Sequence, residues 1–169
     1  MNKVALLIGG NQGDRQTLIE QATEQIRQRI GSVVALSSVY ETEPWGDFEL
    51  DNQKQEIKSF LNRAILVETT LSPWQVLRAA LDIEAGLGRK RPDFSIFNFQ
   101  FSIEKKYRSR PMDIDIIFYD DLVMDTPELT LPHPRMHLRR FVLEPLAEIM
   151  PDHVHPTLRK SIKHLLDEV

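Results

Sequence analysis

The chain contains no cysteine, and this absence excludes disulfide bonds, thiolate zinc sites and thiol catalysis together. Its N-terminus has only a short apolar run before glycine and polar residues, which predicts neither a signal peptide nor a membrane-spanning segment. The net charge is −4, so a general polyanion-binding surface is not expected, although basic residues can still cluster locally. We therefore expect a cytoplasmic protein that binds neither membranes nor nucleic acids.

The chain also lacks internal repeats and low-complexity tracts. Its 169 residues are enough for one domain with a proper core and too few for two. Hydrophobic residues make up 41% and charged residues 27%, which is ordinary for a globular protein. A single domain over residues 1–169 is the expectation.

A phosphate-binding loop is a third absence. The sequence GGNQGD at residues 9–14 lacks both the G-K-[ST] ending of a P-loop and the full G-x-G-x-x-G spacing. A tight turn from a strand over 4–8 into a helix capped by Asp14 fits these residues better.

The remaining elements follow from hydrophobic periodicity and from helix start signals. Ser72, Pro73 and Gln75 form the start of a helix, as in a capping box. His153 and His155 are expected on a surface loop. The other predictions are strands over 32–42, 60–70 and 112–118, a small hairpin over 120–134, and helices over 142–149 and 157–166.

The order strand, helix, strand, strand, helix, strand is that of a split βαβ unit. We therefore predict an α+β fold: a ferredoxin-like core with a mostly antiparallel sheet and added C-terminal helices, arranged as an α/β/α sandwich. Many unrelated functions use this fold, so the function must come from the site.

Two carboxylates interrupt the apolar strand over 112–118. Side chains alternate along a strand, so Asp113 and Asp115 are predicted to lie on the same face. They are either incidental acids on a solvated face or the ligands of a divalent cation. Mg²⁺ prefers a few carboxylate oxygens together with water and substrate phosphates, which favours a Mg-nucleotide site.

Three basic clusters flank this strand: 89–91, Arg108 with Arg110, and Arg139 with Arg140. Runs of charge commonly lie on a solvated face. If the clusters converge on the acidic pair, their guanidinium groups suit a triphosphate, because an arginine binds phosphate through two parallel hydrogen bonds.

Six ordered blocks make the chain similar, over nearly its whole length, to the 6-hydroxymethyl-7,8-dihydropterin pyrophosphokinase family of folate biosynthesis. The R-x-x-D-x-D-I pattern, followed by L-P-H-P-R and R-F-V-L-x-P-L, is its most specific part. The blocks are LLIGGNQGDR, SSVYETEPWG, FLNRAILVET, IEAGLGRKR, RSRPMDIDIIFYDD and LTLPHPRMHLRRFVLEPLAEIMP.

The resemblance implies transfer of pyrophosphate from ATP to the hydroxymethyl group of the pterin, with release of AMP. It assigns two Mg²⁺ ions to Asp113 and Asp115. It implies three catalytic arginines that contact the phosphates, namely Arg110 and, from a catalytic loop, Arg89 and Arg91. Further ATP contacts are implied for Leu77, Glu84, Ile116, His133 and Arg139. No residue is assigned as a general base.

The resemblance also implies a pterin pocket. The pterin would lie against the rings of Phe141 and Phe60, and the amide of Asn62 would read its hydrogen-bonding edge. Phe60 stands where the family often has tyrosine, and Tyr107 is the only aromatic residue shortly before Arg110. The remaining pocket residues are Thr42, Glu43, Pro44 and Trp45.

The catalytic loop, residues 89–110, is longer than is usual for the family. Within it, FSIFNFQFSI at 94–103 alternates apolar and polar residues, which predicts a strand with one apolar face. The apolar face of such a strand is expected to be buried. The strand would fold over the active site as part of a lid, or pack against a sheet edge or a second subunit. We expect a monomer, with a dimer through 94–104 as the alternative.

Two other functions are compatible with parts of the sequence. A ferredoxin-like RNA-binding module needs exposed aromatic residues and a basic sheet face, and the negative net charge disfavours it. A two-metal phosphodiesterase or nuclease would also use the Asp pair, and it would act without a pterin.

Overall fold

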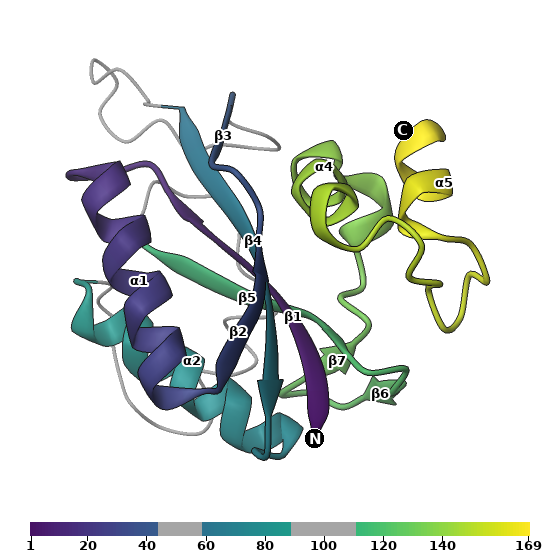
Figure 1. Cartoon of the computed structure of the whole chain (residues 1–169), viewed down its shortest axis with the longest axis horizontal. Helices are drawn as coiled ribbons and strands as arrows, with labels where there is room; N and C mark the ends of the chain where they lie inside the picture. Colours follow the sequence, from purple (N-terminus) through teal and green to yellow (C-terminus); the bar gives the residue numbers. More distant parts are fainter. Residues whose placement is uncertain (44–58, 89–110) are drawn as a thin grey trace.

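Five strands form one antiparallel sheet in the computed structural model, which describes residues 1–43, 59–88 and 111–169 (Figure 1). The order is β2-β4-β1-β5, and β2 and β3 pair with successive parts of the same edge of β4. The strands are β1 (Asn2–Gly10), β2 (Ser32–Leu36), β3 (Tyr40–Thr42), β4 (Phe60–Thr69) and β5 (Asp113–Tyr119).

Helices cover both faces of this sheet (Figure 1). One pair lies on one face and a second pair on the other: α1 (Arg15–Arg29) with α2 (Pro73–Gly86), and α4 (Arg140–Ile149) with α5 (Ile162–Asp167). The chain order β1-α1-β2-β4-α2-β5, with the β2-β4-β1-β5 sheet, confirms the split βαβ of a ferredoxin-like α+β sandwich.

A small second sheet follows β5, as the sequence predicts. It is a two-stranded antiparallel hairpin, followed by a single 3₁₀ turn that leads into α4. These elements are β6 (Met124–Asp125), β7 (Thr130–Leu131) and η1 (Met136–Leu138).

Both predicted helix caps are present. The Asp14 carboxylate accepts the N–H of Thr17 at the start of α1, which supports a structural role for the GGNQGD turn. At the start of α2, Ser72 accepts the N–H of Gln75, and the Gln75 side chain accepts the N–H of Ser72 in return. This reciprocal pair is the expected capping box.

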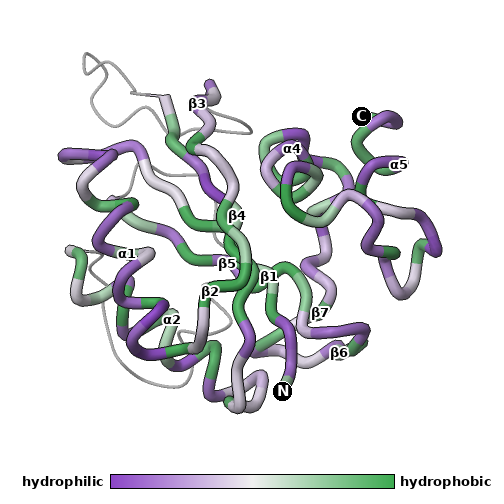
Figure 2. The backbone as a smooth tube through the Cα atoms, viewed as in Figure 1, coloured by the Kyte–Doolittle hydropathy of each residue, from purple (hydrophilic) through white to green (hydrophobic). Residues whose placement is uncertain are grey.

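The apolar side chains form one core on each face of the sheet, and Figure 2 shows hydrophilic residues concentrated on the outer sides of the helices. A β-bulge in the β1–β5 pairing turns both Ile117 and Phe118 toward the α4 side. The core under α1 and α2 includes Val4, Leu6, Ile8, Ile26, Ile65 and Ile116. The core under α4 and α5 includes Ala5, Leu7, Ala64, Val142, Leu143 and Leu146.

Three local predictions were wrong. The strand expected over 32–42 is broken at Ser37 and Ser38, so that β2 and β3 are separate. The helix expected over 157–166 begins only at Ile162, because 155–160 form a turn in which His155 Nδ1 accepts the N–H groups of Thr157 and Leu158. His155 is therefore 5% exposed rather than a surface residue. The predicted strand at 94–103 lies outside the described residues.

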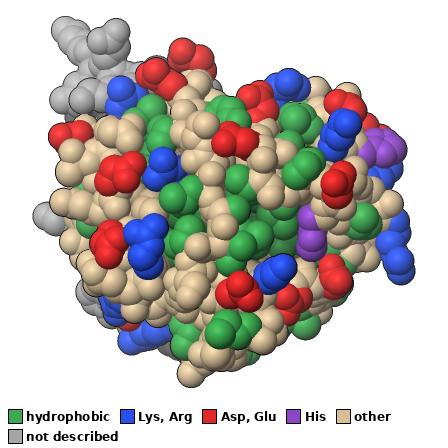
Figure 3. Space-filling model, in the orientation of Figure 1, with side chains coloured by type: hydrophobic (Ala, Val, Ile, Leu, Met, Phe, Trp, Pro, Cys, Tyr) green, Lys and Arg blue, Asp and Glu red, His purple; other side chains and the backbone are tan. Residues whose placement is uncertain are grey.

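The edge strand β2 exposes apolar side chains, since Val34 is 48% and Leu36 37% exposed. In the space-filling view, hydrophobic side chains occupy the middle of this face, with charged residues around them (Figure 3). Among the described residues, no helix is both long and apolar enough to cross a membrane.

Candidate active site

The register of three adjacent strands places the predicted pterin-reading amide in one row with a predicted metal ligand. Gly9 of β1 is the partner of Asn62 on β4 and of Asp113 on β5. Directly opposite residues in antiparallel strands point to the same side of the sheet. Asn62 and Asp113 therefore project from the same face, with one glycine between them and a Cα separation of about 10 Å, two strand spacings.

This face is the one that α4 covers. Leu7, two residues before Gly9, pairs with Asp115 and packs in the core under α4. Because side chains alternate along β5, Asp115 projects from the same face as Asp113, as the sequence predicts. Both carboxylates are half-buried, so the strand brings two negative charges together beside an apolar core.

Gly9 is needed at the centre of this row. A Cβ atom added there would lie 2.4 Å from Asn62 Oδ1 and 2.4 Å from the carbonyl oxygen of Leu61. Any other residue would displace the amide or separate the strands. The glycine of the GGNQGD turn therefore leaves room for the Asn62 side chain.

The Asn62 side chain is held in place by a neighbouring strand. It is 5% exposed, and its Nδ2 donates to Thr42 Oγ1 at 3.0 Å. Thr42 is in turn the cross-strand partner of Phe60, which projects from the same face as Asn62 two residues away. Asn62, Thr42 and Phe60 are thus brought together on one edge of the sheet.

An ion pair ties the open ends of β3 and β4. Arg15 Nη1 donates to the carbonyl oxygen of Ser59 at 2.9 Å and to its Oγ at 3.0 Å, and it lies 3.3 Å from Glu41 Oε2. The hydrogen bond from Ser59 and then that from Arg15 lower the pKa of Glu41. The start of α1 is therefore bonded to the ends of β3 and β4 that carry Thr42 and Phe60.

The second aromatic residue predicted to contact the pterin is Phe141, in the first turn of α4, the helix that packs over this face of the sheet. It is half-buried and packs at the border of the α4 core. The guanidinium carbon of Arg139 lies 5.8 Å from the centre of its ring, within the range of a cation–π contact. Phe141 and Arg139, predicted to bind different substrates, are thus adjacent.

Among the described strands β5 lies at one end of the sheet, and Glu84 lies along its outer edge. The residue is 1% exposed, and its carboxylate accepts the backbone N–H of Ile114 at 2.6 Å. Ile114 lies between the two aspartates, so Glu84 holds the strand segment that presents them. The sequence placed Glu84 near the nucleotide, and this backbone contact was not predicted.

The predicted adenine residues lie on the other face of β5. Ile116 is in the core under α1 and α2, and Leu77 of α2 packs against that core. His133 lies along the edge of β5, between the two faces of the sheet, where its backbone N–H donates to the carbonyl oxygen of Ile117. A nucleotide that used all of these residues would cross the edge of β5, with its base on one face and its phosphates on the other.

The carboxylate pair fits Mg²⁺ as a substrate-bound ion better than as a fully enclosed one. Among the described residues, no group of three or more histidine or acidic side chains could enclose a metal. Asp113 and Asp115 supply two carboxylates from one strand face, which leaves the remaining positions to water and to phosphate oxygens. The donor set is therefore compatible with Mg²⁺ held between protein and triphosphate.

Several predicted site residues lie outside the described residues, namely Pro44, Trp45, Arg89, Arg91 and Arg110. Glu43 is exposed at the end of β3. Of the second basic pair, Arg140 makes an ion pair with Glu144 at 2.6 Å and points along α4. The convergence of the three basic clusters remains a prediction.

Two contacts at the site were missed from the sequence. Glu148 of α4 accepts hydrogen bonds from Tyr40 and Ser38, and Gly9 makes room for Asn62. Tyr40 is the cross-strand partner of Asn62, and both contacts depend on the pairing of distant strands, for which the sequence carries no local signal.

Comparisons with known proteins agree on one family. The profile of the 7,8-dihydro-6-hydroxymethylpterin-pyrophosphokinase (HPPK) family matches residues 5–151. The chain is 38% identical over 154 residues to the 2-amino-4-hydroxy-6-hydroxymethyldihydropteridine pyrophosphokinase of Porphyromonas gingivalis, covering 90% of this chain and 93% of that protein. The Bacillus subtilis protein of the same name is 38% identical over 151 residues, covering 88% and 79%.

The fold is also found in solved structures. Plasmodium falciparum HPPK-DHPS with SDX-DHP superposes with a TM-score of 0.71 at 16% sequence identity. The match covers 99% of this chain and 43% of that one, so the chain spans less than half of the longer protein. At this identity the likeness concerns the fold alone.

Proposed function

Because the chain belongs to the 7,8-dihydro-6-hydroxymethylpterin-pyrophosphokinase family, we propose that it transfers pyrophosphate from ATP to 6-hydroxymethyl-7,8-dihydropterin. The products are AMP and the pterin diphosphate, in a step of folate biosynthesis. The transfer joins the hydroxymethyl oxygen to the β-phosphorus of ATP, and the bond from that phosphorus to the oxygen shared with the α-phosphate breaks.

The observation that carries this proposal is the row Asn62, Gly9, Asp113. A flat pterin whose hydrogen-bonding edge meets Asn62 can lie over Gly9, where no side chain projects. Its far end then points toward the carboxylates, about 10 Å away across two strand spacings. In this orientation the hydroxymethyl group would lie beside the phosphates, as in-line transfer requires.

The residues divide into two groups by role. Asn62, Phe60, Phe141 and the chain around Thr42 and Glu43 bind and orient the pterin, with Pro44 and Trp45 as further contacts. Leu77, Glu84, Ile116, His133 and Arg139 bind ATP or support its site.

Catalysis on this proposal depends on positioning and on charge neutralisation. Asp113 and Asp115 would hold two Mg²⁺ ions, which when bound neutralise the phosphate oxygens and draw charge from the β-phosphorus. Arg89, Arg91 and Arg110 would add positive charge around the same phosphates. We assign no general base.

The two cores share one sheet, which supports a single domain over residues 1–169. We further propose that the protein acts as a cytoplasmic monomer. Light scattering on the purified protein measures the mass in solution, and a dimeric mass would contradict the proposal.

The test is incubation with ATP, Mg²⁺ and the hydroxymethyl-dihydropterin while AMP is quantified. We expect one AMP for each pterin diphosphate, and neither product when the pterin or Mg²⁺ is omitted. No AMP in the complete mixture would overturn the proposal. Release of hydrolysis products without pterin would instead support a phosphodiesterase.

A further inference from the structure

Glu148, near the end of α4, makes a set of hydrogen bonds to the segment that precedes and begins β3. Its carboxylate accepts the N–H of Ser38 at 3.1 and 3.0 Å through its two oxygens, and the Ser38 hydroxyl at 3.2 Å. It also accepts the Tyr40 hydroxyl at 2.7 Å. One side chain of α4 therefore contacts two residues of the segment beside β4.

These bonds connect the two elements that carry the predicted pterin contacts: α4 with Phe141, and the β3–β4 pair with Asn62. Tyr40 is the cross-strand partner of Asn62, so it moves with the amide. Phe141 lies seven residues before Glu148 in α4, which puts both on the same side of the helix, two turns or about 10 Å apart. Glu148 thus joins the element that carries the ring to the strand pair that carries the amide.

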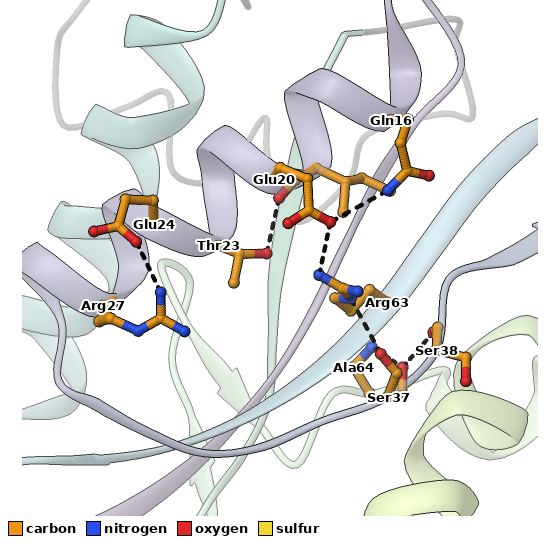
Figure 4. Close-up of polar contacts among 10 residues, drawn as sticks. Gln16, Glu20, Thr23, Glu24, Arg27, Ser37, Ser38, Arg63 and Ala64 are labelled. Carbon is orange, nitrogen blue, oxygen red and sulfur yellow. Dashed lines mark hydrogen bonds and ion pairs between the residues drawn. The ribbon is translucent and has the colours of Figure 1, made fainter.

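The segment that Glu148 holds is fixed independently from the other face of the sheet. Arg63 Nε donates to the carbonyl oxygen of Ser37 at 3.1 Å, and its Nη1 donates to Glu20 of α1 at 3.2 Å (Figure 4). Ser37 Oγ accepts the N–H of Ala64 at 2.9 Å. The break between β2 and β3 is therefore anchored to β4 and α1, and Glu148 adds the connection to α4.

Apolar packing alone does not set the position of α4 to this degree. Val142, Leu143 and Leu146 bury the helix against the sheet, but hydrophobic attraction has no direction and permits small shifts and rotations. Hydrogen bonds depend strongly on distance and angle. Those at Glu148 can fix the turn of the helix about its axis, and with it the direction of Phe141.

We propose that Glu148 is a positioning residue for pterin binding, which sets the separation of Phe141 from Asn62 through its bonds to Ser38 and Tyr40 without touching either substrate. The proposal rests on the proposed pterin pyrophosphokinase function. It predicts that loss of the Glu148 carboxylate weakens pterin binding and leaves ATP binding nearly unchanged. ATP would be held mainly by β5, α2 and the 132–133 segment, which these bonds do not touch. Arg139, at the start of α4, is the one proposed ATP contact that α4 carries.

The test compares Glu148→Gln with a matched control, Glu144→Gln. Both remove one negative charge from α4, but Glu144 pairs with Arg140 on the same helix and, within the described part of the chain, makes no hydrogen bond to β3. Calorimetry with the pterin alone and with the ATP analogue alone gives two dissociation constants for each variant. Steady-state kinetics then separate KM from kcat.

For Glu148→Gln we expect the dissociation constant of the pterin to rise about fivefold, because the amide keeps one acceptor oxygen and its NH2 group cannot accept the bonds made to the other oxygen. Its ATP constant and its kcat at saturating pterin should stay within about twofold of wild type, below the factor that one hydrogen bond typically supplies. Glu144→Gln should match wild type in all three. Equal losses for both ligands, or a folded Glu148→Gln with unchanged pterin affinity, would overturn the proposal.

Tyr40→Phe keeps the ring and removes one donor, so it provides a second test that does not depend on the folding of Glu148→Gln. A loss of affinity confined to the pterin supports the proposal. Unchanged affinity for the pterin, or an equal loss of affinity for the pterin and the ATP analogue, contradicts it. Failure of the proposed function is a separate outcome, since wild type would then neither bind the pterin nor form AMP. Normal wild-type activity with normal variants contradicts only the role of Glu148.

Discussion

Two glutamates hold opposite edges of the sheet, and they do so in different surroundings. Glu84 of α2 is 1% exposed and accepts the Ile114 N–H between the two aspartates. Glu148 of α4 is exposed and accepts bonds from Ser38 and Tyr40 beside the strand that carries Asn62. One therefore supports the predicted metal ligands from inside the core, and the other supports the predicted pterin wall from the surface.

The difference in burial predicts a difference in what each residue controls. A buried donor left without its acceptor costs the full desolvation penalty, whereas a solvated one regains hydrogen bonds to water. Changes at the β5 edge should thus affect both stability and phosphate chemistry. Changes at the β3 edge should mainly affect the geometry of the pterin pocket.

The largest effect is expected at the carboxylates that Glu84 supports. Asp113→Asn and Asp115→Asn should each lower turnover by about a hundredfold to a thousandfold, because the loss of one preorganised electrostatic interaction typically costs 10²–10³ in kcat. The melting temperature without Mg²⁺ should be unchanged or higher, since like-charge repulsion is relieved. Steady-state kinetics and thermal unfolding of the same samples check this. A variant with near-normal turnover would exclude the metal role.

Glu84 itself should show the mixed effect that its burial implies. Glu84→Ala leaves the buried N–H of Ile114 without this acceptor, so the free energy of unfolding should fall by about 1–3 kcal/mol. Turnover should fall as well, because the segment between the aspartates is less well fixed.

Glu84→Gln is the matched control, since its amide oxygen can still accept the Ile114 N–H. Urea denaturation of both variants should show the larger loss for alanine. If the two variants are equally stable and equally active, the contact with Ile114 does not support the site.

Substitutions at the predicted pterin contacts should lower the affinity for the pterin rather than the rate of the chemical step. Asn62→Ala and Phe141→Ala should weaken pterin binding by about 1–3 kcal/mol and about 0.5–1.5 kcal/mol beyond ring burial, respectively. ATP binding should change far less. Calorimetry with each ligand separately gives the comparison, and equal losses for both ligands would count against the assigned pocket.

The smallest effect is a pH dependence that belongs to the β3 edge. The hydrogen bond to Glu148 is the main cause that raises the pKa of Tyr40 from 10.0 to about 12, with the charge of Glu144 as a lesser one. The same bond is the main cause that lowers the pKa of Glu148 from 4.5, and Arg63 contributes to this.

A raised pKa in the folded state means that the Tyr40 contribution to stability is full below pH 10.0 and is lost as the pH rises through about 12. A lowered pKa means that the Glu148 contribution is present above pH 4.5 and is lost as the pH falls through the lowered value. Urea denaturation of wild type and Tyr40→Phe across this range checks both. The stability difference between them should shrink above pH 10.0, and a constant difference up to pH 12 would contradict the assigned bond.

The sequence predicted well wherever the cause is local. The caps at Asp14 and Ser72, the hairpin after β5 and the shared face of Asp113 and Asp115 depend on residues within a few positions of each other. The matching motifs supplied the candidate substrates and most of the candidate residues. Local prediction failed at Ser37 and Ser38, where two strands along one edge of β4 replace one, and at the turn before Ile162.

What the sequence by itself determined is therefore the order of the elements, the split βαβ class and the carboxylate pair. The tertiary structure decided which distant residues share a row. Asn62 and Asp113 lie in one row, on either side of Gly9, only because β1 pairs with β4 and β5 in one particular register. A shift of one residue would turn either side chain to the other face. That register is set by the two cores that form on the faces of the sheet, and no local pattern in the chain records it.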